Sequence, residues 1–259
     1  MKYVIQLITL FALVFTVNTA LARGGHNPPP APEPNNLMNV ITVSAENGDY
    51  ESLIEALNSI TNAAEENQYV IQIGPGTYDL GNAQIILKPW VKINGAGRSF
   101  TVIRGSRASN DDDSEAAMII GADHAALMRV GIENTGDGLL YSIGIRNDNA
   151  SPAIKHVKVT VVGSVNNVGI SNNNNSEPAI EDVRVFVPGT GVIVDNSSPF
   201  IVDSRLAGSP GLQLNDSPGS RAVNNMIIGG VEVYMSVTPT SGSVCRGNYD
   251  QYLMDVDCP

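Results

Sequence analysis

Apolar positions in the middle of this 259-residue chain repeat at intervals of 20–27 residues. Four short segments align on the aliphatic residues Ile145, Ile170, Val194 and Leu214, and each has a polar residue two positions later: Asn147, Asn172, Asn196 and Asp216. Three more columns share one irregular spacing: Leu127, Ile154, Ile180, Ile201 and Val223; Val130, Val157, Val183, Ser204 and Met226; Ile132, Val159, Val185, Leu206 and Ile228. Because such a short unit buries no apolar face alone, it must stack on its neighbours. The pattern predicts an all-β solenoid.

Within one repeat, residues 157–161 alternate between apolar and polar. This period of two predicts a strand in which Val157, Val159 and Val161 face the core while Lys158 and Thr160 face outward. Prolines recur at one phase of each repeat and predict corners, because proline lacks a backbone donor: Pro152, Pro178, Pro199 and Pro218. We expect the amides of Asn147, Asn172 and Asn196 to stack as an inward ladder at a tight turn.

The segment before the repeats predicts a lid for the solenoid. Residues 40–44 have the composition of a strand, and Asp49 precedes a helical pattern from Tyr50 to Ala64, where it is placed to cap the helix. A helix here would cover core that the first coil otherwise exposes. Further strands are expected at residues 69–73, 84–87, 91–93 and 101–103, and a projecting loop at residues 106–115.

Residues 40–105 also resemble the N-terminal part of the pectin lyase-like superfamily, and of pectin methylesterases in particular. The resemblance rests on Gly48-Asp49-Tyr50 before an amphipathic helix, on a strand ending in Gly76-Thr77-Tyr78, and on the coil Val91 to Gly97. It implies a right-handed parallel β-helix with an N-terminal capping helix. Esterases, lyases, hydrolases and non-catalytic proteins share that fold, so it specifies no activity.

The catalytic motifs of these families have no counterpart in the chain. The Gly-Asp-Phe-x-Phe-Gly strand of pectin methylesterases is absent, as are the Asn-Thr-Asp and Gly-Asp-Asp elements of polygalacturonases. The Trp-x-Asp-His element of pectate lyases is also missing, since the single tryptophan lies in Lys88-Pro89-Trp90.

The ends of the chain predict export. Residues 1–22 combine Lys2, an apolar run and a small-residue cleavage site after Ala22, which is typical of a signal peptide and places the protein outside the cell or in the periplasm. Residues 23–39 predict a proline-rich extended leader, and residues 40–259 one β-helix domain. Cys245 and Cys258 are expected to form a disulfide that closes the C-terminal tail, with a free-thiol pair or a metal site as alternatives.

Charge narrows the class of partner. Removal of Lys2 with the signal peptide takes the formal net charge from −11 to −12. Such a field repels nucleic acids and anionic membrane surfaces, and the mature chain has no transmembrane segment. A neutral glycan remains compatible with this charge, whereas an acidic polysaccharide needs a local basic stripe.

One predicted outward face gathers such a stripe. It consists of His156, Lys158, Asp182, Arg184, Asp203 and Arg205. Asp182 and Asp203 align in adjacent coils, with His156 and Asn225 above and below them, and Ile227 continues the row of Lys158, Arg184 and Arg205. Two carboxylates at this spacing suit glycoside hydrolysis, and a basic group beside a charge neutraliser suits a lyase. The alternative is a ladder of ion pairs on the outer wall, in which Arg184 and Arg205 neutralise Asp182 and Asp203.

A second cluster offers oxygen ligands. Asp111, Asp112 and Asp113 form an acidic run that suits Ca²⁺ in its ligand type, although the run has the spacing of no calcium loop. The alternative is a solvated acidic loop. No other cofactor is expected.

Together these features favour an exported, non-catalytic β-helix that binds a polysaccharide or a surface partner along one face. A divergent polysaccharide lyase or carbohydrate esterase acting on acidic glycans is the first alternative, and a purely structural module is the second. The sequence leaves the oligomeric state and the ligand open.

Overall fold

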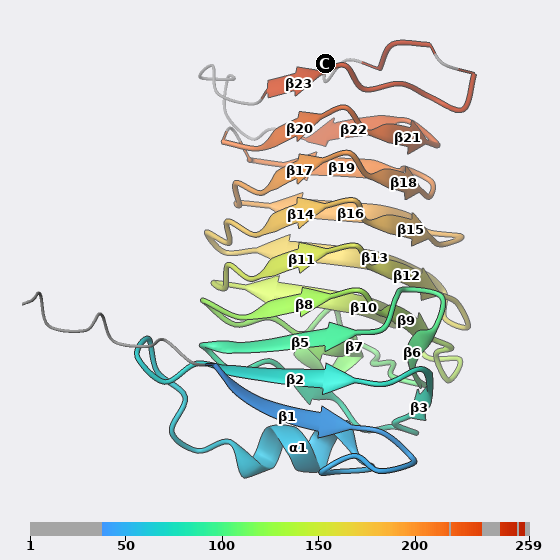
Figure 1. Cartoon of the computed structure of the whole chain (residues 1–259). Helices are drawn as coiled ribbons and strands as arrows, with labels where there is room; N and C mark the ends of the chain where they lie inside the picture. Colours follow the sequence, from blue (N-terminus) through green and yellow to red (C-terminus); the bar gives the residue numbers. More distant parts are fainter. Residues whose placement is uncertain (1–37, 218, 235–243, 253, 257–259) are drawn as a thin grey trace, which may run out of the picture. The chain divides into compact units, whose positions relative to one another are not determined.

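The computed structural model describes residues 38–217, 219–234, 244–252 and 254–256. This part of the chain winds into a right-handed parallel β-helix whose coils lie one above another (Figure 1). Every pairing between its named strands is parallel, and the strands form three sheets, which we number 1 to 3. The predicted all-β solenoid is confirmed.

The sheets hold the following strands in spatial order. Sheet 1 contains β1 (Asn39–Val43), β2 (Tyr69–Ile73), β5 (Val91–Gly95), β8 (Ala126–Met128), β11 (Ala153–Lys155), β14 (Ala179–Glu181), β17 (Phe200–Val202), β20 (Arg221–Val223) and β23 (Val244–Arg246). Sheet 2 contains β3 (Gly76–Asp79), β6 (Thr101–Gly105), β9 (Gly131–Asn134), β12 (Lys158–Val161), β15 (Arg184–Phe186), β18 (Arg205–Ala207) and β21 (Met226–Ile228). Sheet 3 contains β4 (Ile85–Ile86), β7 (Ala117–Ile120), β10 (Tyr141–Asp148), β13 (Asn166–Asn173), β16 (Thr190–Asp195), β19 (Leu212–Asn215) and β22 (Val231–Tyr234).

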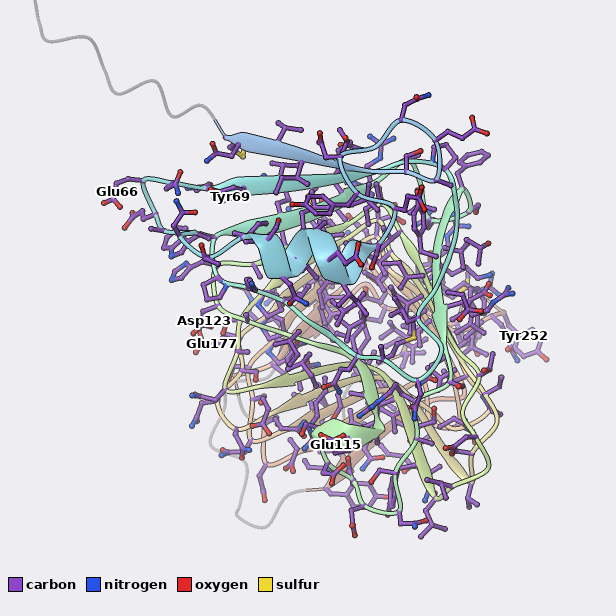
Figure 2. The ribbon with its side chains drawn as sticks, turned by 90° about the horizontal axis from the view of Figure 1, so that it is seen from below. Glu66, Tyr69, Glu115, Asp123, Glu177 and Tyr252 are labelled. Carbon is purple, nitrogen blue, oxygen red and sulfur yellow. The ribbon has the colours of Figure 1, made fainter. Side chains whose placement is uncertain are left out.

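A helix covers the N-terminal end of the coils, as the pattern predicted. Seen from that end, α1 (Leu53–Ser59) lies across the coil interior beside β1 and β2 (Figure 2). The helix is shorter than expected, and Ser52 caps it in place of Asp49 by accepting a hydrogen bond from Glu55 N. Asp49 instead accepts hydrogen bonds from the backbone N and the hydroxyl of Thr42 at 2.8 and 2.7 Å, which closes the turn after β1.

Three of the four aliphatic columns form continuous internal rows. The column of Ile145 and Ile170 instead continues to Val192 and Leu212, two residues before the predicted Val194 and Leu214. Ile154 pairs with Leu127 on one side and Ile180 on the other, and each of the three is fully buried. The predicted register fails by one residue in the last coil. There Ala222, Asn225 and Ile227 are the buried members, in place of Val223, Met226 and Ile228. Met226, Ile227 and Ile228 are all apolar, so the sequence pattern alone does not show which of them faces the core.

The asparagine ladder is shorter than predicted. Asn147 donates to the side-chain oxygen of Asn172 at 2.8 Å, but Asn172 pairs with Val194, and Asn196 is exposed. The register is instead set by a column of inward glycines, two of which are Gly144 and Gly169. A Cβ at Gly169 would lie 2.2 Å from a methyl of Val185, so only glycine fits.

Prolines occupy corners before sheet 1. Pro152, Pro178 and Pro199 immediately precede β11, β14 and β17, and each carbonyl accepts a hydrogen bond from the coil above. Pro218 lies outside the described residues, as do the predicted signal peptide, the leader up to residue 37 and Cys258, so the disulfide stays a prediction. Within the described residues, no helix has the length and apolar character needed to cross a membrane.

Candidate functional site

A column of left-handed residues turns the chain from sheet 1 into sheet 2. Its members have φ between 46° and 56° and are Arg129, His156, Asp182, Asp203 and Asn224. We call this set the corner column. Positive φ at each level makes a sharp bend and directs the side chains out of the coil. Asn225, which the sequence placed in this column, is instead buried, and its side-chain oxygen accepts from Ser204 N at 2.9 Å.

Asp182 is the most strongly bonded member of the corner column. His156 Nδ1 lies 2.8 Å from Asp182 Oδ2, and Arg98 Nη1 donates to Asp182 Oδ1 at 2.9 Å and to the Asp182 carbonyl at 2.7 Å. Partial burial disfavours the charged carboxylate, but the hydrogen bonds from His156 and Arg98 together outweigh it, so the pKa of Asp182 lies below its usual value. The carboxylate is therefore ionised at neutral pH.

Arg98 comes from a loop that crosses the outside of sheet 2. This loop, Ala96 to Phe100 between β5 and β6, is called the strap. Figure 1 shows it rising from the end of β5 past the coils above. Thr101 accepts a hydrogen bond from Ala96 N at 2.9 Å and donates to the Gly74 carbonyl at 2.9 Å, which fixes the base of the strap. The bonds of Arg98 to Asp182 fix its tip.

Three cations stack on the outer face of sheet 2. Lys158 pairs with Arg184, and Arg184 pairs with Arg205, in adjacent strands of the sheet. We call these three residues the cation row. Successive strands lie about 4.8 Å apart, so the charges form a closely spaced line. Met226 continues the row in place of the expected Ile227, which is buried.

The cations of this row have no carboxylate partner among the described residues. The ion pairs there join other groups, such as Arg98 with Asp182 and Arg104 with Glu133. The expectation that Arg184 and Arg205 neutralise Asp182 and Asp203 is therefore wrong, because the strap supplies Arg98 to Asp182 instead. The face is not a ladder of ion pairs.

A second row runs beside the cation row on the same face. Thr160 pairs with Phe186, and Phe186 with Ala207. The guanidinium carbon of Arg205 lies 5.4 Å from the centre of the Phe186 ring, a cation–π distance. The hydroxyl of Thr160 is buried and has no hydrogen-bond partner within the described part of the chain. An unsatisfied hydroxyl of this kind is costly.

Cavities follow these two rows. The first, about 450 Å³, lies between the strap and the corner column at Arg129, His156 and Asp182. The second, about 490 Å³, is lined by Arg98, Ser99, Lys158, Thr160, Arg184 and Phe186. The third, about 380 Å³, is lined by Asp182, Arg184, Phe186, Asp203, Ser204, Arg205, Asn224, Met226 and Tyr249. Because they share lining residues, the cavities adjoin, and we call them together the sheet 2 groove.

The six residues singled out by sequence thus lie on one face and line the groove. The sequence missed Arg98, Phe186 and Tyr249 as groove residues. No local pattern signals Arg98, which reaches Asp182 across 84 positions of the chain. Phe186 was visible at an outward phase, next to the arginine column, and that position was the available signal.

Asp182 does not have the environment of the acid in a glycosidase pair. Such a pair needs one carboxyl with a raised pKa as the acid. Hydrogen bonds from His156 and Arg98 keep the pKa of Asp182 below its usual value, so this carboxylate is ionised at neutral pH and has no proton to donate. The groove is equipped to bind anions more than to protonate a leaving group.

The acidic run lies on another side of the coils. Asp112 Oδ1 accepts a hydrogen bond from Arg146 Nη1 at 2.8 Å, and Asp113 caps the short 3₁₀ helix η1 (Ser114–Ala116). In Figure 2, Glu115 of η1 lies in the half of the view opposite β1 and β2. Within the described ranges no three His, Cys, Asp or Glu side chains converge as a metal site requires, and the calcium candidate gains no support.

Comparison with solved structures identifies the fold. The chain is similar to the pectin methylesterase from Aspergillus niger, with 10% identity, coverage of 82% of this chain and 86% of that one, and a TM-score of 0.56. For the Yersinia enterocolitica pectin methylesterase the identity is 12%, the coverage 78% and 90%, and the TM-score 0.51. A pectin methylesterase solved with a hexasaccharide matches at 12% identity, 85% and 91% coverage, and a TM-score of 0.50.

The chain has the pectin lyase-like fold. This confirms what the resemblance of residues 40–105 implied. No family model and no curated protein matches the sequence. Identities this low establish the pectin lyase-like fold alone, so any activity must be argued from the groove.

Proposed function

We propose that this protein is an exported β-helix that binds an acidic polysaccharide along the sheet 2 groove. The observation that carries the proposal is the cation row, in which Lys158, Arg184 and Arg205 have no carboxylate partner in the described part of a chain whose net charge is −11. Long-range repulsion disfavours acidic ligands elsewhere on this surface, so an unpaired basic stripe selects where one binds.

The neighbouring row supports a sugar ligand. Phe186 presents an aromatic ring in the groove, beside the cation row. A pyranose ring has an apolar face that packs against such a ring. A pectin methylesterase of the same fold was solved with a hexasaccharide, which is consistent with a glycan in a groove of this fold.

Binding without turnover is the primary test. The mature protein is titrated by calorimetry with polygalacturonate, alginate and chondroitin sulfate, and with neutral dextran as the comparison ligand. We expect binding to at least one acidic polymer, weaker at higher salt, and none to dextran. Equal binding to dextran, or binding to none of the four, would refute the proposal.

A lyase is the second candidate, because elimination from a uronate needs a base beside a charge neutraliser and Lys158 adjoins Arg184. The same mixtures are assayed for unsaturated uronides by absorbance. Product that disappears in Lys158→Ala would establish catalysis. Without product, binding stands as the function.

A further inference from the structure

The cation row ends at a glycine in the direction of the strap. Below Lys158 the paired position in sheet 2 is Gly131, and below Gly131 it is Val102. A Cβ on Gly131 would lie 2.7 Å from the carbonyl oxygen of Arg98. The main chain of the strap therefore rests directly on this position and fills the space where the row would continue.

The second row is closed at the same level. Below Thr160 the paired residue is Glu133, which accepts hydrogen bonds from Arg104 Nε at 2.9 Å and from Arg104 Nη2 at 2.6 Å. Both hydrogen bonds go to one carboxylate oxygen, so Glu133 and Arg104 form a salt bridge at this level of the second row. An acidic polymer meets a carboxylate there in place of a free cation.

The strap is held down at its tip. Arg98 bonds to both the carboxylate and the carbonyl of Asp182, in the coil that also carries Arg184. Its side chain is only 19% exposed. A ligand that ran past the strap would have to displace both bonds and the backbone contact at Gly131.

In the opposite direction the groove continues past Arg205 to uncharged residues. Met226 follows Arg205, and Tyr249 is bridged to Met226 in the next coil. The groove spans five coil levels from Lys158 to Tyr249, and the four steps between them correspond to about 19 Å at about 4.8 Å per step.

From this asymmetry we infer that the sheet 2 groove binds the end of an acidic glycan chain, with the terminal sugar against the strap at Arg98 and Ser99. The inference rests on the proposed function and adds to it the part of the polymer that is recognised. An open groove would accept any internal stretch, whereas a groove closed at one end accepts only a chain terminus.

The number of proteins bound per polymer chain distinguishes binding at a chain end from binding along the chain. Excess protein is mixed with size-fractionated chains of the acidic polymer that binds best in the calorimetric panel, and the complexes are measured by light scattering after size exclusion. We expect one protein per chain whatever the chain length, and an affinity that stops rising once an oligosaccharide spans about 19 Å. Chains coated by several proteins would overturn the inference and leave the proposed function intact, whereas no binding to any acidic polymer would overturn both.

A variant of the strap tests whether this loop is what restricts binding to the end of a chain. In Arg98→Ala the tip is released, and we expect long chains to carry more than one protein each. Lys155→Ala removes the ion pair with Glu181 on sheet 1, outside the groove, and serves as the control, with one protein per chain. If Arg98→Ala folds poorly, blocking each terminus of a short oligosaccharide in turn gives the same answer with the unaltered protein: one blocked end should abolish binding, and tolerance of both blocks would refute end recognition.

Discussion

Arg98 and Asp182 are 84 positions apart in the sequence and are joined by two hydrogen bonds, of 2.7 Å to the carbonyl and 2.9 Å to the carboxylate. This pair ties a loop of an early coil to the corner of a coil well above it. The bonds connect the strap to the corner column, two residues before Arg184 of the cation row. Substitutions can test each of these three parts separately.

Loss of the Arg98 guanidinium should free the strap and leave the coils intact. In Arg98→Ala we expect faster amide hydrogen exchange at residues 96–100, while the free energy of unfolding falls by no more than about 1 kcal/mol, as for partly exposed ion pairs. Arg104→Ala breaks a comparable pair with Glu133 and should leave exchange in the strap unchanged. Exchange that stays slow in Arg98→Ala would show that the contact at Gly131 alone holds the loop.

Acid should weaken the Asp182 cluster in a defined direction. The pKa of Asp182 is lower in the folded protein than its usual value of 3.8, because hydrogen bonds from His156 and Arg98 outweigh the effect of burial. The folded state thus gains stability that is fully present above about pH 3.8 and is lost as the pH falls through the lowered pKa. Denaturant unfolding between pH 2 and 6 should show a shallower pH dependence in Asp182→Asn than in the unaltered protein. Parallel curves would mean that the carboxylate does not stabilise the fold.

The sequence predicted the parts of the fold that repeat. Inward rows such as Leu127, Ile154 and Ile180 follow from period-two alternation within strands and from a spacing between coils that several columns share, and both patterns can be read from the sequence. The errors lie where several registers bury equally apolar residues. Ala222 beside Val223 offered two choices, and the structure takes the smaller residue.

Only the groove residues that lie on the repeating coils could be predicted from the sequence. His156, Lys158 and Arg205 were found because outward positions repeat with the coils. Arg98 belongs to no repeat, and its contact with Asp182 depends on the path of a loop in three dimensions, which no local pattern encodes. The expected neutralisation by Arg184 failed for that reason.

Arg205 and Arg221 make a matched pair for testing the groove. Each guanidinium lies over a phenylalanine ring, at 5.4 Å from Phe186 and 5.2 Å from Phe200, but only Arg205 lines the groove. Arg205→Ala should raise the dissociation constant for an acidic glycan about tenfold or more, since a hydrogen bond to a charged group contributes about 1.5–3 kcal/mol. Arg221→Ala should leave it unchanged. Equal losses in calorimetry would indicate a diffuse charge effect and not a groove.

Truncating a side chain in an internal row should lower the free energy of unfolding far more than truncating one at the surface. Ile154 is fully buried between Leu127 and Ile180, so Ile154→Ala should lower the free energy of unfolding by about 2–5 kcal/mol through lost burial and a residual cavity. Val165 is 71% exposed, and Val165→Ala should change it by less than about 0.5 kcal/mol. Similar values for the two variants would contradict the stacking of coils.

The asparagine pair distinguishes the observed register from the one that the sequence suggested. Asn147 is fully buried and donates to Asn172 at 2.8 Å, so Asn147→Ala leaves a buried amide oxygen without that donor and should cost about 1–3 kcal/mol. Asn196 is exposed, with φ of 45°, a conformation that glycine adopts freely, so Asn196→Gly should be close to neutral. If chemical denaturation gave Asn196→Gly the larger loss, Asn196 would belong to a buried ladder, and the pairing of Asn172 with Val194 would be wrong.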